Sequence, residues 1–136
     1  MAAPKATFTE AWLDGPDGHR FYTRTYPPLS SPQPKAVLLF VHGFADHISR
    51  YEDVHPRWAQ RDIAVFAYDM RGFGRTALDA AHRSPGAKYG RTTRALELQD
   101  LEWWILHVAR EYPALPIFIM GYSAVSLVGR LLLWTY

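Results

Sequence analysis

Residues 37–41 read Val-Leu-Leu-Phe-Val, and this unbroken apolar run constrains the fold more than any other feature of the chain. A strand with one face in water alternates apolar and polar side chains, whereas a strand covered on both faces is apolar throughout. Residues 63–68 and 115–120 form two further predominantly apolar runs. Strands buried on both faces are typical of parallel sheets flanked by helices, so the sequence predicts an α/β domain.

Two helices are predicted beside these strands. Residues 93–112 carry apolar side chains at three- and four-residue intervals, which indicates a helix with one buried face. Ser49 and Glu52 have the spacing of a capping box, which predicts a helix from Ser49 to about Arg61. Pro56 falls early enough in that segment that only the first turn is expected to be irregular.

An antiparallel hairpin is predicted at the amino-terminal side. Two alternating segments, residues 7–13 and 19–26, flank the sequence Asp-Gly-Pro-Asp-Gly at residues 14–18, which favours a tight turn. Proline-rich residues 27–34 have too few backbone donors to join a sheet and are predicted to form an extended connection. A hairpin followed by alternating strands and helices predicts one three-layer α/β domain over residues 1–136, with right-handed crossovers.

The composition narrows the class of protein. An apolar fraction of 49% supports a buried core, and a net charge of +2 without any block of like charges argues against nucleic-acid binding. The absence of cysteine excludes disulfides, thiolate metal sites and a cysteine nucleophile. Since no apolar segment has the length of a signal sequence or a bilayer span, we expect a cytoplasmic protein without a transmembrane helix.

Polar residues follow three of the predicted strands, where ligand sites of open parallel sheets lie. These segments are residues 42–44 (His-Gly-Phe), 69–74 (Asp-Met-Arg-Gly-Phe-Gly) and 121–123 (Gly-Tyr-Ser). A serine on a sharp turn between strand and helix is held exposed and can attack a carbonyl carbon, which makes Ser123 the candidate nucleophile. The backbone N–H groups of Phe44 and Ala124 are the candidate donors to the oxyanion.

Four segments keep the order and spacing of one group of enzymes: residues 40–44, the His-x-x-Arg-Tyr pattern at 47–51, residues 69–75 and residues 121–123. From about residue 8 to Ser123, the chain resembles the monoacylglycerol lipase and serine aminopeptidase-like group of α/β-hydrolases, particularly its fungal monoglyceride lipases. The resemblance implies an α/β-hydrolase fold that is truncated after the turn carrying Ser123. The expected part comprises the antiparallel hairpin and three parallel strands with flanking helices.

The resemblance also implies the chemistry of a serine ester hydrolase that needs no cofactor and no metal ion. Ser123 is expected to attack the acyl carbon, with the oxyanion held by the N–H groups of Phe44 and Ala124, and water releases the acyl group. Acylglycerols and related lipid carboxylic esters are the implied substrates, followed by lysophospholipids and small artificial esters. Full-length relatives imply a lid and a peripheral contact with a membrane or a lipid droplet.

Residues 124–136 depart from the pattern of this group. Val125 and Ser126 stand where the group has two glycines, and a branched side chain at the first position strains the turn. Because residues 124–136 contain no Asp, Glu or His, the triad acid and histidine are absent from this segment. We interpret it as a divergent tail, from an alternative splice form, a retained intron or a wrongly assigned gene end. The alternative function is therefore a catalytically inactive isoform or fragment.

Other conspicuous residues are predicted to be structural. The six histidines lack the spacing of a metal site, and His42 is expected to brace the oxyanion loop. Asp69 is expected to accept N–H groups of its own loop, because in the resembled group this residue is not the triad acid. His107 is predicted on the polar side of its helix. Trp103 and Trp104 are interpreted as one partly exposed ring and one core ring.

Overall fold

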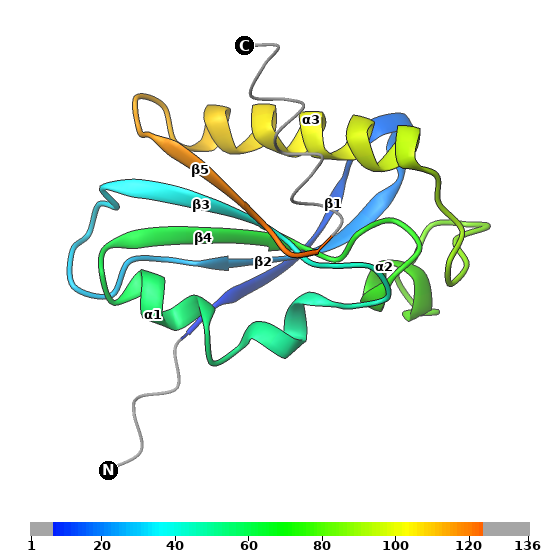
Figure 1. The fold of residues 1–136 in the computed structure, drawn as a ribbon, viewed down its shortest axis with the longest axis horizontal. Coiled ribbons are helices and arrows are strands. Elements are labelled where there is room, and N and C mark those ends of the chain that lie inside the picture. The colour runs from blue at the N-terminus through cyan, green and yellow to red at the C-terminus, as the bar shows by residue number, and fades with distance from the viewer. Residues whose placement is uncertain (1–6, 124–136) are drawn as a thin grey trace.

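The computed structural model describes residues 7–123 and is built around a five-stranded sheet of order β1-β2-β4-β3-β5 (Figure 1). The strands are β1 (Thr9–Asp14), β2 (Arg20–Tyr26), β3 (Ala36–Val41), β4 (Ile63–Tyr68) and β5 (Ile117–Gly121). The α-helices are α1 (His55–Ala59), α2 (Gly74–Leu78) and α3 (Arg94–Glu111), and two short 3-10 helices are η1 (Pro16–Gly18) and η2 (Ile48–Tyr51). Helix α3 covers one face of the sheet and α1 lies against the other, so the predicted three-layer arrangement is confirmed.

Strand β3 lies between β4 and β5 and pairs with both in parallel. All six of its residues are buried, as the unbroken apolar run predicts. Strand β5 pairs with β3 on one side, and within residues 7–123 no strand pairs with its other edge. Its burial alternates, because Ile117 and Ile119 pack against the core on the α3 side while Phe118 and Met120 on the opposite face are exposed.

The predicted hairpin is formed by β1 and β2, which pair antiparallel from Thr9 opposite Thr25 to Asp14 opposite Arg20. The turn between them contains Asp17 and Gly18 in the left-handed region, with φ of 56° and 68°. Aspartate and glycine tolerate this conformation better than most residues, which explains why the turn sequence predicts the hairpin correctly. Strand β2 then joins the parallel strands by pairing antiparallel with β4.

Helix α3 follows the predicted bounds closely. The hydroxyl of Thr93 caps its start by accepting the N–H of Leu96 at 3.2 Å. Leu101, Trp104 and Val108 are buried in the core between the helix and the sheet. Trp103 points away from that face and is partly exposed, as predicted. The three-residue and four-residue spacing of apolar side chains thus identifies the buried face of the helix.

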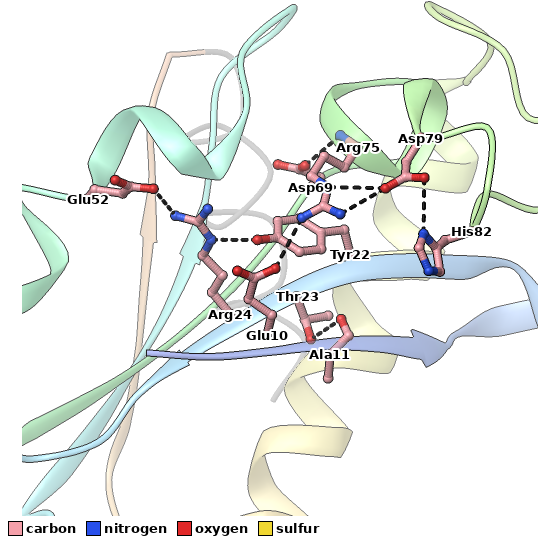
Figure 2. A network of polar contacts seen from close by, with 10 residues as sticks. All are labelled: Glu10, Ala11, Tyr22, Thr23, Arg24, Glu52, Asp69, Arg75, Asp79 and His82. Atoms are coloured by element: carbon pink, nitrogen blue, oxygen red, sulfur yellow. Dashed lines mark hydrogen bonds and ion pairs between the residues drawn. The ribbon is translucent and has the colours of Figure 1, made fainter. Parts of the chain in front are cut away.

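The prediction of one helix from Ser49 to Arg61 is wrong. The segment contains η2 and then α1, which begins only at His55 with Pro56 in its first turn. Glu52 does not complete a capping box, because its carboxylate accepts Arg24 Nη1 at 2.7 Å instead (Figure 2). A proline also lacks the N–H that would continue a helix from the preceding turn. A tertiary ion pair and Pro56 together divide the segment.

One side of the β1–β2 hairpin is held by a polar network (Figure 2). Arg24 is buried, donates Nε to the Tyr22 hydroxyl at 2.7 Å and reaches Glu52 with its other end. Arg75 at the start of α2 forms ion pairs with Glu10 at 3.1 Å and Asp79 at 2.8 Å. The network therefore connects both strands of the hairpin to η2 and α2.

Two histidines lie in surroundings that the sequence does not indicate. His107 is half-buried rather than on the polar side of α3, and its ring lies 5.4 Å from the rings of both Phe66 and Trp104. Burial lowers the pKa of His107 below its usual value. His82, to which the sequence assigns no role, stacks on Trp12 and contacts Asp79 at 3.1 Å.

Candidate active site

The three polar segments predicted at the strand ends meet at one edge of the sheet. Strands β3, β4 and β5 run parallel, and Val41 stands in register with both Tyr68 and Gly121. The residues that follow each strand therefore emerge side by side. This is the edge at which open α/β sheets bind their ligands.

Ser123 is exposed and has a φ of 62°, in the left-handed region that non-glycine residues seldom occupy. The pairing of β3 with β5 continues to the residue before it, because the N–H of Tyr122 donates to the carbonyl of Val41 at 3.2 Å. The chain thus turns sharply at the end of a fixed strand. A serine in this strained conformation fits the turn that presents a nucleophile, and strain of this kind is common at functional sites.

Gly43 brings the loop after β3 into contact with the serine turn. A Cβ atom at Gly43 would lie 3.1 Å from Cδ1 of Tyr122 and 3.5 Å from Cβ of Ser123. The first distance is tighter than most real contacts, so glycine is what allows the two loops to approach this closely. Phe44, the next residue, lines a hollow of about 490 Å³ together with Ser123. Ala124, the second candidate oxyanion donor, lies outside the described residues.

His42 is buried and holds the loop after β3, which confirms its predicted bracing role. The N–H of Met70 donates to His42 Nε2 at 2.8 Å, and Nδ1 lies 2.8 Å from the carbonyl oxygen of Gly43. Because Nε2 accepts an amide hydrogen, the proton belongs on Nδ1, which donates to Gly43. Burial lowers the pKa of His42, so the ring is neutral and links the loops after β3 and β4.

Asp69 is buried and ties the loop after β4 to its surroundings. Its carboxylate accepts the N–H of Ile48 at 2.8 Å. It also accepts the N–H of Arg75 at 2.7 Å (Figure 2). Burial raises the pKa of Asp69, and these N–H groups oppose that shift by stabilising the charged form. Gly74 leaves the space that the carboxylate fills, since a Cβ there would lie 2.3 Å from it. Asp69 therefore has a structural role, as predicted, but one of its two donors, Ile48, lies in η2 and not in the loop that follows Asp69.

A polar wall of the hollow, formed by Asp46, Arg50 and Tyr51, is not predicted by the sequence analysis. The Tyr51 hydroxyl donates to Asp46 Oδ2 at 2.6 Å, and Arg50 lies 3.5 Å from the same carboxylate. Burial disfavours the charged form of Asp46, but hydrogen bonds from Tyr51 and the His47 N–H, with the Arg50 charge, hold its pKa below the usual value. A charged, fixed carboxylate thus borders the same hollow as Ser123.

Other kinds of site find little support in the described part of the chain. Among residues 7–123, no group of three or more His, Asp or Glu side chains is placed to hold a metal ion. None of the helices described there combines the length and apolar character needed to cross a membrane. The site consists of the three loops at the sheet edge.

The chain matches a known protein family over the segments that form this site. The sequence profile of the family described as serine aminopeptidase, S33, matches residues 32–133. The match covers β3, β4, β5 and the loops that follow them. It also extends past Ser123 into the segment that we interpret as a divergent tail, whose origin stays a prediction.

Curated relatives include monoglyceride lipases. The monoglyceride lipase of Rattus norvegicus is 29% identical over 79% of this chain and 32% of its own length. The monoacylglycerol lipase of Mycolicibacterium smegmatis is 26% identical over 87% of this chain and 39% of its own length. The chain therefore spans roughly a third of the length of these relatives.

Solved structures confirm the predicted α/β-hydrolase fold. A thermostable carboxyl esterase from Bacillus coagulans, in complex with glycerol, has a TM-score of 0.73 and 26% identity, over 91% of this chain and 39% of its own. A soluble variant of monoglyceride lipase from Saccharomyces cerevisiae, in complex with a substrate analogue, has a TM-score of 0.67 at 22% identity. This second match covers 90% of this chain and 37% of that one, and at its lower identity it shows the fold alone.

Proposed function

Because this chain belongs to the serine aminopeptidase, S33, family of α/β-hydrolases, we propose that its site is that of a serine ester hydrolase. In this proposal Ser123 Oγ attacks the acyl carbon of a carboxylic ester, the alcohol leaves, and water hydrolyses the acyl-serine. One observation carries it: Gly43 lies against Ser123, which sits in a left-handed turn at the end of β5. That approach aligns the loop after β3 with the candidate nucleophile.

The proposed oxyanion donors are the backbone N–H groups of Phe44 and Ala124. Support for Phe44 comes from the hydrogen bonds of His42, which fix the loop that carries it. A donor that is held in place before the reaction is worth about 3 kcal/mol of transition-state stabilisation in comparable sites. The bracing histidine is thus proposed to act through the loop and not on the substrate.

The proposed substrates are acylglycerols and related lipid carboxylic esters. Support comes from relatives named monoglyceride lipase or monoacylglycerol lipase and from the polar wall beside Ser123. Asp46 accepts hydrogen bonds and Arg50 donates them, which suits the hydroxyl groups of a glycerol headgroup. We further propose a cytoplasmic protein whose longer relatives contact a membrane or lipid-droplet surface peripherally.

A second candidate is that the 136-residue chain has no hydrolase activity by itself. His42 and Asp69 are the histidine and carboxylate that directly follow parallel strands, and both are engaged in holding loops together. Neither is available as the base or acid of a triad, and residues 124–136 supply none. Loss of the base costs on the order of a million-fold in turnover, so weak activity at most is expected if no other residue replaces it.

A fluorophosphonate probe distinguishes the two candidates. The purified chain is incubated with the probe and with a short-chain ester, beside Ser123→Ala and the control Ser30→Ala on the 27–34 connection. Labelling and turnover that depend on Ser123 alone support the hydrolase. Absence of both, in a chain whose thermal unfolding is cooperative, supports the inactive form. Equal labelling of the Ser123→Ala chain would contradict the assignment of the nucleophile.

A further inference from the structure

We infer that the side chain of Phe44 limits the size of the acyl group that the site accepts, an inference that rests on the proposed function. Phe44 borders two separate hollows. One, of about 490 Å³, contains Ser123, and the other, of about 250 Å³, lies toward Met70 and the start of α3. Phe44 therefore belongs to the walls of both hollows.

The ring of Phe44 is both prominent and anchored. It is 74% exposed, the largest exposed fraction among the large apolar side chains of the described residues. One side contacts Phe73 edge to face, with the ring centroids 5.1 Å apart, and Phe73 itself is buried. Exposed aromatic surface is costly in water, so a ring held in this position is suited to contact an apolar ligand.

The second hollow is lined by apolar side chains of Phe44 and Met70 and by several polar residues at the start of α3. Met70 is nearly fully buried and gives it an apolar, adaptable side. Thr92 and Arg94 also line it, and Arg94 contacts Glu97 at 3.5 Å. Phe44 is the residue that both linings share, so we place it on the path of an alkyl chain that extends from Ser123 into the second hollow. We therefore expect the Phe44 ring to set the alkyl-chain length beyond which further methylene groups of the ligand make no new contact with the protein.

Replacement of the ring separates its role from that of the backbone. Phe44→Ala keeps the N–H proposed to bind the oxyanion and removes only the shared wall. In the unchanged chain, affinity is expected to rise with alkyl length and then level off. In Phe44→Ala it is expected to continue rising, by about fourfold for each newly buried methylene group.

The test uses binding of non-hydrolysable 1-alkylglycerol ethers, from hexyl to dodecyl, to the full chain, measured by titration calorimetry. Phe44→Ala is expected to bind the dodecyl ether about fifteenfold more tightly than the unchanged chain, the gain from roughly two methylene groups, and the hexyl ether with similar affinity. Leu78→Ala is the control, since Leu78 is also an exposed apolar residue but borders neither hollow. The affinity of Phe44→Leu for the dodecyl ether is expected to lie between those of the unchanged chain and Phe44→Ala.

The inference would be overturned if the ether affinities of the unchanged chain and of Phe44→Ala depended on alkyl length in the same way. An equal change of the dodecyl affinity in Leu78→Ala, or no binding of any ether, would also overturn it. Ether binding needs no nucleophile, whereas probe labelling does. Parallel series together with labelling at Ser123 therefore contradict only the role of Phe44. A change in chain-length preference without labelling contradicts only the proposed hydrolase.

Discussion

Strands β3 and β5 run parallel, neighbour each other and end at the same site, yet they are supported very differently. Every residue of β3 is buried between two layers of helices, and the loop after it is braced by His42. Strand β5 is partly exposed along its length, with Phe118 exposed by 58%. The Phe44 side of the candidate site thus rests on the core, while the Ser123 side rests on an edge of the described sheet.

The loops after β3 and β4 hold the site in place, whereas the turn after β5 carries the exposed serine. The loops after β3 and β4 are joined by the hydrogen bond from Met70 to His42, and Asp69 fixes the second of these loops to η2 and α2. The serine turn is joined to β3 by the hydrogen bond of Tyr122 and by its contact with Gly43. We expect substitutions on the β3 and β4 side to change stability and those on the β5 side to change the site with little loss of stability.

The largest effect is expected from Asp69→Ala. It leaves the backbone N–H groups of Ile48 and Arg75 without their acceptor, and each unpaired buried donor costs about 1–3 kcal/mol. We expect the free energy of unfolding to fall by about 4 kcal/mol in urea denaturation. Asp53→Ala, at an exposed carboxylate, is the control and should change it little. Equal losses in both variants would show that Asp69 does not support the loops as described.

The comparison of the two strands is tested directly by Leu39→Ala on β3 and Phe118→Ala on β5. Leu39 is fully buried, so its truncation removes apolar contacts and leaves a cavity, at a cost of about 3 kcal/mol. Phe118 is largely exposed, so its truncation is expected to cost less than about 1 kcal/mol. Urea denaturation measures both. A loss at Phe118 as large as that at Leu39 would mean that β5 is covered in solution.

An acid-sensitive element is expected on the β3 side. His55 is buried among Tyr26, Phe40 and Tyr51, and burial, with Arg24 nearby, lowers its pKa from 6.5 to about 4. A histidine with a lowered folded-state pKa takes up its proton more readily in the unfolded chain, so it destabilises the fold as pH falls from 6.5 toward 4. We expect His55 to account for about 3 kcal/mol of stability lost over this pH range.

The contribution of His55 is measured as a difference in pH dependence. Urea denaturation of the unchanged chain and of His55→Leu is followed over this pH range. The stability of His55→Leu should fall less on acidification, because the variant cannot take up the proton. Leu78→Ala serves as a control for an unrelated substitution and should keep the slope of the unchanged chain. Identical slopes in His55→Leu and the unchanged chain would contradict a buried, neutral histidine.

Features with a local cause were predictable from the sequence. The apolar run of β3, the apolar periodicity of α3 and the turn residues of the hairpin each determine their element through neighbouring residues. The meeting of Gly43 and Ser123 follows from a topological rule, since parallel strands end at one edge. The identity and position of these candidate residues therefore needed no knowledge of tertiary contacts.

Features that depend on distant partners were not predictable. Glu52 fits a capping box by spacing, but Arg24 of β2 binds it, and the helix begins after it. The pairing of Asp46 with Tyr51 spans an irregular turn that no periodicity describes. The surroundings of His107 depend on the facing Phe66 of β4. For Glu52 and His107, a tertiary contact outweighs a weaker local preference.

The smallest effect is expected from Tyr51→Phe, which removes one hydrogen bond from the polar wall and keeps the ring against Phe40. Because Tyr51 helps to hold the pKa of Asp46 below its usual value, the variant should raise that pKa and cost about 1 kcal/mol of stability. Nuclear magnetic resonance titration of the Asp46 carboxyl carbon measures the shift, with Tyr89→Phe as the control at an exposed tyrosine. An unchanged titration would mean that Arg50 and the His47 N–H alone fix the carboxylate. In that case the Tyr51 hydrogen bond would contribute little to the polar wall. The stability of the β3 side would then depend on its buried core residues, which β5 lacks on its exposed face.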